Sequence, residues 1–209
     1  ISGPMAGSPG LFQDILDDME NTEINTVVID LKNDEGRITC NIDSPIITEI
    51  GACKNYVQDI ETLIRTLKDR GLYVIARVVA FRDPYLAEKK PEWSLHTADG
   101  KLYRDKQGMA WVDPYCKEVW DYLMEVGTIA KEVGFDEVQF DYIRFSTDST
   151  MKNVVYDEER AQGRSKTEVI TEFCQYAYEN LASQGLFVSA DVNSRVRVVS
   201  DLVLRSIRR

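Results

Sequence analysis

The chain has 209 residues, of which 44% are hydrophobic and 29% charged, values typical of one globular domain rather than of a disordered or fibrous chain. Its formal net charge of −10 argues against nucleic acid or an anionic membrane surface as the main partner. No stretch approaches the roughly 18 continuous apolar residues of a membrane span, and we expect no signal peptide within the chain.

The cysteines and the histidine content bear on cofactors. Four cysteines are widely spaced without a CxxC pair, and His96 is the only histidine. This spacing predicts neither a zinc cluster nor a disulfide framework. No GxGxxG or GxxxxGK[ST] motif follows a strand-like run, so we expect no metal and no other cofactor.

Amphipathic helices alternate with strand-like runs along the chain. The first helix is expected over about 10–20, where Ser8 and Pro9 supply a cap and a first turn. Later helices, each with a glycine at or near its end, are expected over 55–70, 116–133 and 167–182. Strand-like runs lie at 26–32, 72–81, 136–142 and 186–192, and the opening "ISGP" fits the end of another strand.

This order predicts an α/β fold with a parallel sheet and right-handed crossovers. Two architectures compete, an open doubly wound sheet and a closed TIM-type (β/α)8 barrel. Insertions of roughly thirty and twenty residues follow the strands at 72–81 and 136–142, at the strand ends where barrel enzymes build their sites. Together with the missing nucleotide motifs, these insertions favour the barrel.

Strand parity places the polar residues of the strands on one side. Side chains alternate faces along a strand, so Val27, Ile29 and Leu31 share an apolar side suited to packing under helices. Every polar residue of the strand cores falls on the opposite side, which in a barrel is the lumen. The residues predicted to converge near its C-terminal mouth are Asp30, Lys32, Arg77, Gln139, Asp141, Ser189 and Asp191.

Paired carboxylates at neighbouring strand ends can divide acid and base roles. Parallel strands lie about 4.8 Å apart, so such carboxylates come within several ångströms of each other. One can stay ionised while crowding raises the pKa of the other, which is the arrangement used in glycoside hydrolysis. We assign Asp141 as nucleophile or charge stabiliser, Asp191 as the second carboxylate, and Asp30 as the reserve. A purely structural ion network that includes Asp30, Lys32 and Arg77 is the alternative.

The candidates for substrate binding combine polar and aromatic side chains. Aromatic residues gather on or beside the two insertions, and their flat faces suit the apolar faces of sugar rings. The alternative is that they only pin the loops to the barrel rim. The predicted substrate-binding residues are Arg77, Gln139, Arg144, Lys32, Phe81, Trp93, Trp111 and Tyr142.

Three blocks carry a resemblance to a known family. The stretches "ARVVAFRDPYLAEKKPEW", "WVDPYCKEVWDY" and "GFDEVQFDYIRF" resemble the bacterial family described as "putative glycosyl hydrolase domain". The stretch "AGSPGLFQDILDDMENTEINTVVIDLKNDEG" is similar to its opening, and the resemblance covers about residues 5–192. It implies a (β/α)8 barrel, exported or associated with the cell surface, that processes a polysaccharide.

Two departures accompany this resemblance. The block around Asp141 is faintly similar to the DxxDxDxE pattern of chitinase-type barrels, but Gln139 and Ile143 replace an Asp and the acidic Glu, which argues against chitinase chemistry. The basic segment 193–209 shows no family match, so we expect a partial barrel over 1–192 with about five of the eight βα units. Its open strand edges would invite self-association.

Three functions therefore compete. The first is a glycoside hydrolase acting on a polysaccharide or a cell-wall or extracellular glycan. The second is a non-catalytic carbohydrate-binding barrel or an inactive fragment, because no Glu ends a strand. A sugar deacetylase is the third and is disfavoured by the absence of a histidine cluster. In each case we expect a carbohydrate partner at an extracellular or cell-surface location.

Overall fold

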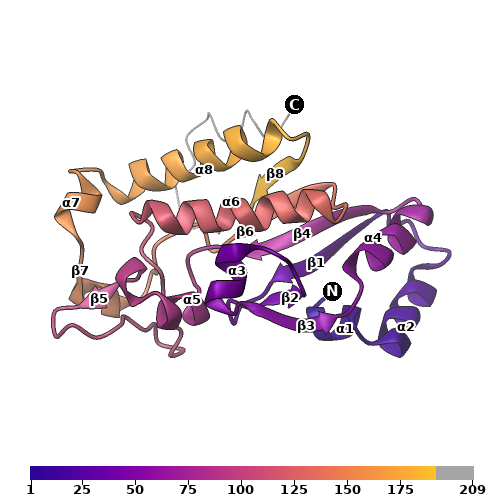
Figure 1. Cartoon of the computed structure of the whole chain (residues 1–209), viewed down its shortest axis with the longest axis horizontal. Helices are drawn as coiled ribbons and strands as arrows, with labels where there is room; N and C mark the ends of the chain where they lie inside the picture. The colour runs from indigo at the N-terminus through magenta and orange to yellow at the C-terminus, as the bar shows by residue number, and fades with distance from the viewer. Residues whose placement is uncertain (192–209) are drawn as a thin grey trace.

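The computed structural model describes residues 1–191, which form a mixed α/β fold around one six-stranded sheet (Figure 1). The strand order is β3-β2-β1-β4-β6-β8. The strands predicted from the sequence are all present and run parallel as neighbours. They are β1 (Thr26–Lys32), β4 (Tyr73–Val79), β6 (Glu137–Asp141) and β8 (Phe187–Ala190).

A short hairpin extends this sheet beyond β1. Strand β2 (Ile38–Cys40) runs antiparallel to β1, and β3 (Cys53–Val57) runs parallel to β2. The opening "ISGP", expected as the end of a strand, is not a strand, because Gly3 and Pro4 begin helix α1 (Gly3–Ala6). The amide of Asp30 still donates to the carbonyl of Ile1 at 3.0 Å. Within residues 1–191 the sheet stays open, with β3 and β8 at its edges, so the closed barrel is not formed there. The expected self-association through these edges stays a prediction.

The four helices predicted from the sequence are present, and one of them begins later than predicted. The four expected helices are α2 (Pro9–Met19), α4 (Ile60–Asp69), α6 (Lys117–Glu132) and α8 (Lys166–Ala182), and two short ones, α1 (Gly3–Ala6) and α3 (Pro45–Ile50), join them. The helix expected over 55–70 begins only at Ile60, because Asp59 caps it by accepting a hydrogen bond from the Thr62 amide. Tyr56 lies on β3 instead. None of the helices in residues 1–191 is long and apolar enough to cross a membrane.

The apolar side of the sheet packs under α6 and α8, as parity predicted (Figure 1). Phe173 of α8 is the centre of this contact. Its ring lies 5.6 Å from that of Phe140 on β6 and 5.7 Å from that of Trp120 on α6. Val138 and Phe140 are buried among the same side chains. Burial of this aromatic layer leaves the opposite side of the sheet to the polar residues.

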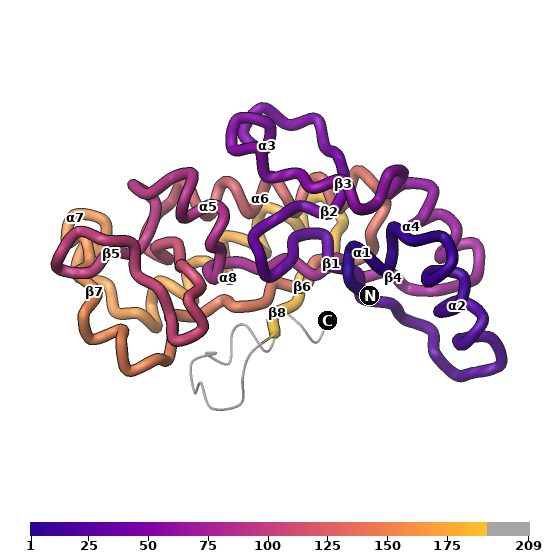
Figure 2. The backbone as a smooth tube through the Cα atoms, turned by 90° about the horizontal axis from the view of Figure 1, so that it is seen from below, coloured from indigo at the N-terminus to yellow at the C-terminus, as the bar shows by residue number. Residues whose placement is uncertain are grey.

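The two insertions join each other beyond the carboxyl ends of β4 and β6. Residues 80–116 contain α5 (Pro84–Lys89), the turn η1 (Pro91–Trp93) and β5 (His96–Thr97), and residues 142–165 contain η2 (Ser149–Asn153), β7 (Val154–Val155) and α7 (Glu158–Ala161). Strand β5 pairs antiparallel with β7. Figures 1 and 2 both place β5, β7 and α7 at the end of the molecule opposite α2. The pairing fixes both insertions over the strand ends.

All four cysteines are free thiols in the described part of the chain. Burial raises the pKa of Cys40 and of Cys116 to about 12, and that of Cys174 to about 11. At neutral pH these three thiols are therefore protonated and poor nucleophiles.

Lys32 does not lie with the other polar residues of the strands, and this corrects the prediction that it binds substrate. The pairing of β1 with β4 shifts between Asp30 and Lys32, and this irregularity changes the direction of the lysine. Its Nζ lies 2.7 Å from Asp83 Oδ2, and both side chains are 0% exposed. Burial raises the pKa of Asp83, an effect that Lys32 partly offsets. Lys32 thus forms a buried ion pair that ties β1 to the start of α5.

We predict that Lys32→Met destabilises the fold by about 3–5 kcal/mol, because it leaves the Asp83 carboxylate buried without its cation. The double variant Lys32→Met/Asp83→Asn should be more stable than the single one, since Asn keeps an oxygen to cap α5 without the charge. Urea unfolding followed by circular dichroism measures both. Equal stability of Lys32→Met and the parent protein would contradict a structural role for the pair.

Candidate active site

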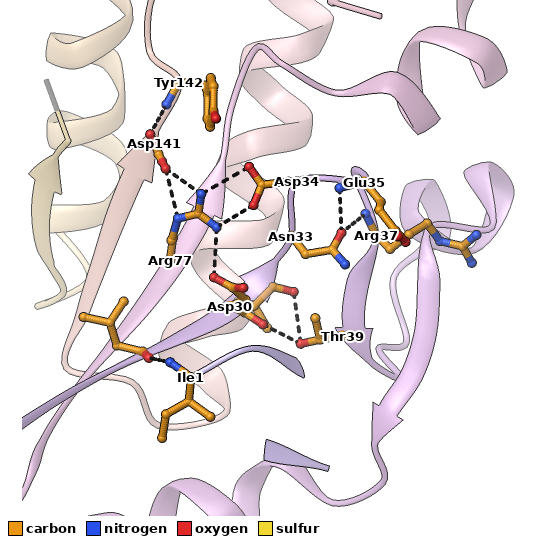
Figure 3. A network of polar contacts seen from close by, with 12 residues as sticks. Ile1, Asp30, Asn33, Asp34, Glu35, Arg37, Thr39, Arg77, Asp141 and Tyr142 are labelled. Carbon is orange, nitrogen blue, oxygen red and sulfur yellow. Dashed lines mark hydrogen bonds and ion pairs between the residues drawn. The ribbon is translucent and has the colours of Figure 1, made fainter. Parts of the chain in front are cut away.

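Arg77 lies at the centre of a polar cluster on the side of the sheet facing away from α6 and α8 (Figure 3). In the sheet register Asp30, Arg77 and Gln139 lie side by side on β1, β4 and β6. The Arg77 guanidinium donates to Asp30 Oδ1 at 2.9 Å and to Asp141 Oδ2 at 2.6 Å. The structure therefore brings together three of the residues that strand parity predicted to converge.

Asp34 is the fourth member of this cluster, and the sequence analysis missed it. Its two carboxylate oxygens accept from Arg77 at 3.1 and 3.4 Å. The turn between β1 and β2 holds it there, because the side chain of Asn33 accepts from the amides of Glu35 and Arg37 (Figure 3). The stretch "NDEG" after the strand is a turn signal. This signal predicts a turn, but it does not show that the turn places Asp34 against Arg77 on β4.

Gly36 completes this turn and has to be glycine. Its φ of +79° lies in the left-handed region, which other residues rarely adopt. A Cβ at this position would meet Asp83 Oδ1 at 1.9 Å, so the close approach excludes a side chain as well. The turn that carries Asp34 is thus packed against the buried pair of Lys32 and Asp83.

The cluster holds three carboxylates around a single cation, so its formal charge is −2. Arg77, Asp30 and Asp141 are each only about one-fifth exposed, at 20%, 20% and 19%, whereas Asp34 is 46% exposed. Burial acts to lower the pKa of Arg77, but its hydrogen bonds to Asp34, Asp141 and Asp30 outweigh burial and raise it above its usual value. The guanidinium therefore stays charged and holds the carboxylates by charge-assisted hydrogen bonds.

Asp141 has the most closely defined orientation of the three. Its Oδ2 accepts from Nε of Arg77 at 3.0 Å and from Nη2 at 2.6 Å, and its Oδ1 accepts from the amide of Tyr142 at 2.7 Å. It is the last residue of β6, at the carboxyl end of the strand. Both oxygens are thus fixed, and the carboxylate points toward Arg77 at the carboxyl end of the sheet (Figure 3).

A second polar layer lies toward the amino ends of the strands. Glu137, which the sequence analysis also missed, accepts hydrogen bonds from the hydroxyls of Ser189 and of Tyr73, the latter at 3.0 Å. Ser189 therefore belongs to this second layer and does not lie with Asp141 at the carboxyl ends of the strands. Gln139 is half-buried between the two layers, and within residues 1–191 its side chain makes no hydrogen bond.

Asp191 is the last residue that the structure describes. Its amide donates to the carbonyl of Phe140 at 2.8 Å, so it lies beside the end of β6, the strand that carries Asp141. Its side chain is exposed and forms no ion pair with any residue of the described part.

A cavity of about 300 Å³ lies between the two insertions and is lined by Tyr142, the residue that follows Asp141. Tyr142, Trp111 and Arg144, all predicted to bind substrate, lie together on its wall. Tyr142 has a φ of +55°, a strained conformation for a non-glycine residue and one that often marks a functional site. Arg144 lies over the rings of Trp111 and Tyr142, at 5.4 and 5.3 Å from their centroids. The other lining residues are Arg82, Asp105, Lys106, Gln107, Ser146, Thr147 and Asp148.

Two predicted aromatic contacts are not in this cavity. Phe81 is fully buried, with its ring 4.9 Å from Phe173 of α8, because β4 ends at Val79 and its alternation does not continue. Trp93 lies in η1 beneath the Lys90 ammonium, away from the lining residues. Trp111 does line the cavity, but it is almost fully buried and donates to Asp105 at 3.0 Å, so it shapes the wall.

No group of three or more His, Cys, Asp or Glu residues is placed to hold a metal ion in residues 1–191. In the acidic cluster the guanidinium of Arg77 occupies the position between the carboxylates.

The solved structures that resemble this chain include one of closely similar fold and length. A hypothetical protein from Ruminiclostridium thermocellum ATCC 27405 shares 39% identity and a TM-score of 0.84, over 92% of this chain and 96% of that one. A search of curated protein sequences found no match.

Several glycosidases share the fold at low identity. An exo-β-N-acetylglucosaminidase from Vibrio harveyi has 14% identity and a TM-score of 0.68, over 96% of this chain and 35% of that one. An α-L-fucosidase from Paenibacillus thiaminolyticus has 14% identity and a TM-score of 0.61, over 86% of this chain and 29% of that one. This chain spans about a third of these enzymes, and at such identity the likeness concerns the fold.

A family model extends the comparison to nearly the whole sequence. It is described as "Putative glycosyl hydrolase domain" and matches residues 1–203. The match runs past residue 192, where we expected the resemblance to end, into the part of the chain outside the described residues. Because the family model matches nearly the whole sequence, this chain belongs to the "Putative glycosyl hydrolase domain" family.

Proposed function

We propose that this protein is a glycoside hydrolase acting on a polysaccharide or another extracellular or cell-surface glycan, with Asp141 at the reaction centre. The observation that carries the proposal is the Asp141 carboxylate, fixed by Arg77 and the Tyr142 amide at a strand end that opens beside a cavity. Family membership supports it, and so does the rule that barrel enzymes react at the carboxyl ends of their strands.

Asp141 acts in this proposal as nucleophile or charge stabiliser. Cleavage of a glycosidic bond passes through an oxocarbenium-like state, in which positive charge develops at the anomeric carbon. The formal charge of −2 around Arg77 lies where it would stabilise that carbon. Because the oxygens of Asp141 are already held by three N–H donors, little reorganisation is needed at the moment of reaction. Asp30 and Asp34 then add charge and position Arg77.

The reaction also needs a proton donor for the leaving oxygen. Asp30 and Asp34 already accept hydrogen bonds from Arg77, which argues against them for this role. Asp191 has no cation partner in the described part of the chain and lies at the end of the strand next to Asp141. We therefore assign proton donation to Asp191.

Replacing Asp141 by Asn should reduce hydrolysis by about 1,000-fold or more, because the fixed carboxylate is lost while the shape is kept. Release of reducing ends from a panel of polysaccharides measures this, with circular dichroism as the check on folding. Asp121→Asn is the matched control, since Asp121 lies on α6 and, within residues 1–191, accepts a side-chain hydrogen bond only from Tyr176. Undiminished turnover by Asp141→Asn would refute the assignment, and glycan binding by the parent protein without any release would favour a binding barrel.

Replacing Asp191 by Asn should produce a different signature. We expect a loss of about 100-fold or more on a natural glycan, and little loss on an aryl glycoside whose phenolate leaves without a proton. Measuring kcat on both substrates separates the two roles. An equal loss on both would show that Asp191 is not the proton donor.

A further inference from the structure

The cavity beside Asp141 contains one arginine whose charge is not balanced. In the described part of the chain the Arg144 side chain makes a single hydrogen bond, to the carbonyl of Phe145 at 3.3 Å. Its guanidinium otherwise lies against the rings of Trp111 and Tyr142, and no carboxylate within residues 1–191 forms an ion pair with it. The side chain is half-buried, so most of its donors remain available to a molecule in the cavity.

The other arginine of the cavity is fully engaged. Arg82 donates to Asp105 at 3.1 Å, to the hydroxyl of Tyr142 at 3.0 Å, and to the side-chain oxygen of Gln107. Asp105 in turn accepts from Trp111 and from the amides of Gln107 and Met109. Burial acts to raise the pKa of Asp105, but these donors and Arg82 lower it overall. Arg82 and Asp105 therefore form a neutral framework that builds the wall.

The remaining charges make the cavity cationic. Arg144 and Lys106 carry positive charge, and Asp148, whose Oδ2 accepts from the Lys106 amide at 2.7 Å, is the only other carboxylate of the lining. The lining thus has a formal charge of +1 in a chain whose net charge is −10. A neutral sugar in the cavity would leave the guanidinium of Arg144 partly desolvated without an anionic partner, which costs free energy.

The cavity and the acidic cluster adjoin each other through one residue. Tyr142 forms part of the cavity wall, and its amide donates to Asp141. A sugar unit in the cavity would therefore neighbour the unit that reacts. Beside a cluster with a formal charge of −2 an acidic sugar would be repelled, unless a cation such as Arg144 compensates.

We propose that this cavity is a subsite for an acidic sugar, with the planar guanidinium of Arg144 binding its carboxylate and the ring of Tyr142 forming the adjacent wall. The substrate class is then a glycan with uronic acid units. This inference rests on the proposed function, because the acidic glycan is a substrate only if the protein hydrolyses glycans. Binding of the acidic sugar is nevertheless measurable without hydrolysis.

The test compares each acidic glycan with its own carboxyl-reduced form, so that backbone and linkage stay the same. Isothermal titration calorimetry of Asp141→Asn, which prevents turnover, uses oligosaccharides of hyaluronan, polygalacturonate and alginate together with their reduced counterparts. We expect at least one acidic form to bind about 10-fold or more tightly than its reduced form, with an affinity that falls as salt is added.

Arg144→Gln, added to Asp141→Asn, should abolish that preference while the affinity for the reduced form changes little. The matched control is Arg104→Gln, because Arg104 lies in the other insertion, pairs with Glu88 and does not line the cavity. Equal affinity for the two forms, no binding of any acidic form, or a preference that survives Arg144→Gln would each overturn the proposal. If the protein hydrolyses only neutral glycans, this inference is overturned and the proposed function stands. If it binds acidic glycans selectively but hydrolyses none, the proposed function is overturned and the acidic subsite stands.

Discussion

The candidate active site depends on one guanidinium. Arg77 contacts Asp30 on β1, Asp34 in the turn after β1, and Asp141 at the end of β6, so it joins the polar sides of three neighbouring strand units. Three half-buried carboxylates at such distances would repel one another without it. The cation therefore determines both where the carboxylates lie and how much negative charge faces the mouth of the sheet.

The groups proposed for chemistry and the cavity proposed for recognition lie on different parts of the molecule. Of the charged groups proposed for chemistry, Asp30 and Asp141 lie on strands and Asp191 directly follows one, so the backbone ladder sets their positions. The cavity proposed for recognition lies on the two insertions, which are held together by the pairing of β5 with β7. Tyr142 connects the two parts, because its strained backbone follows β6 directly and its ring forms a wall of the cavity. A change in the insertions can thus alter the sugar that is recognised and leave the carboxylates in place.

Strand parity predicted a large part of this arrangement. The convergence of Asp30, Arg77 and Asp141 followed from the two-residue alternation of strands alone. Alternation failed where the strands are irregular: the shift after Asp30 sends Lys32 into a buried pair with Asp83, and the end of β4 at Val79 lets Phe81 turn toward α8. Parity also has no means of placing residues outside strands, and for this reason Asp34 was missed.

The sequence by itself determined the strands β1, β4, β6 and β8 and the four longest helices, which side of these strands is polar, and that the insertions leave the carboxyl ends of β4 and β6. These properties follow from local periodicity and from the chemistry of turns, which a single chain records directly. Only the tertiary structure decided that Asp34 folds back onto Arg77, that Lys32 is buried, and that Arg144 lines a cavity without an anionic partner among residues 1–191. Each of these depends on contacts between segments far apart in the chain, and such contacts leave no periodic trace in the sequence.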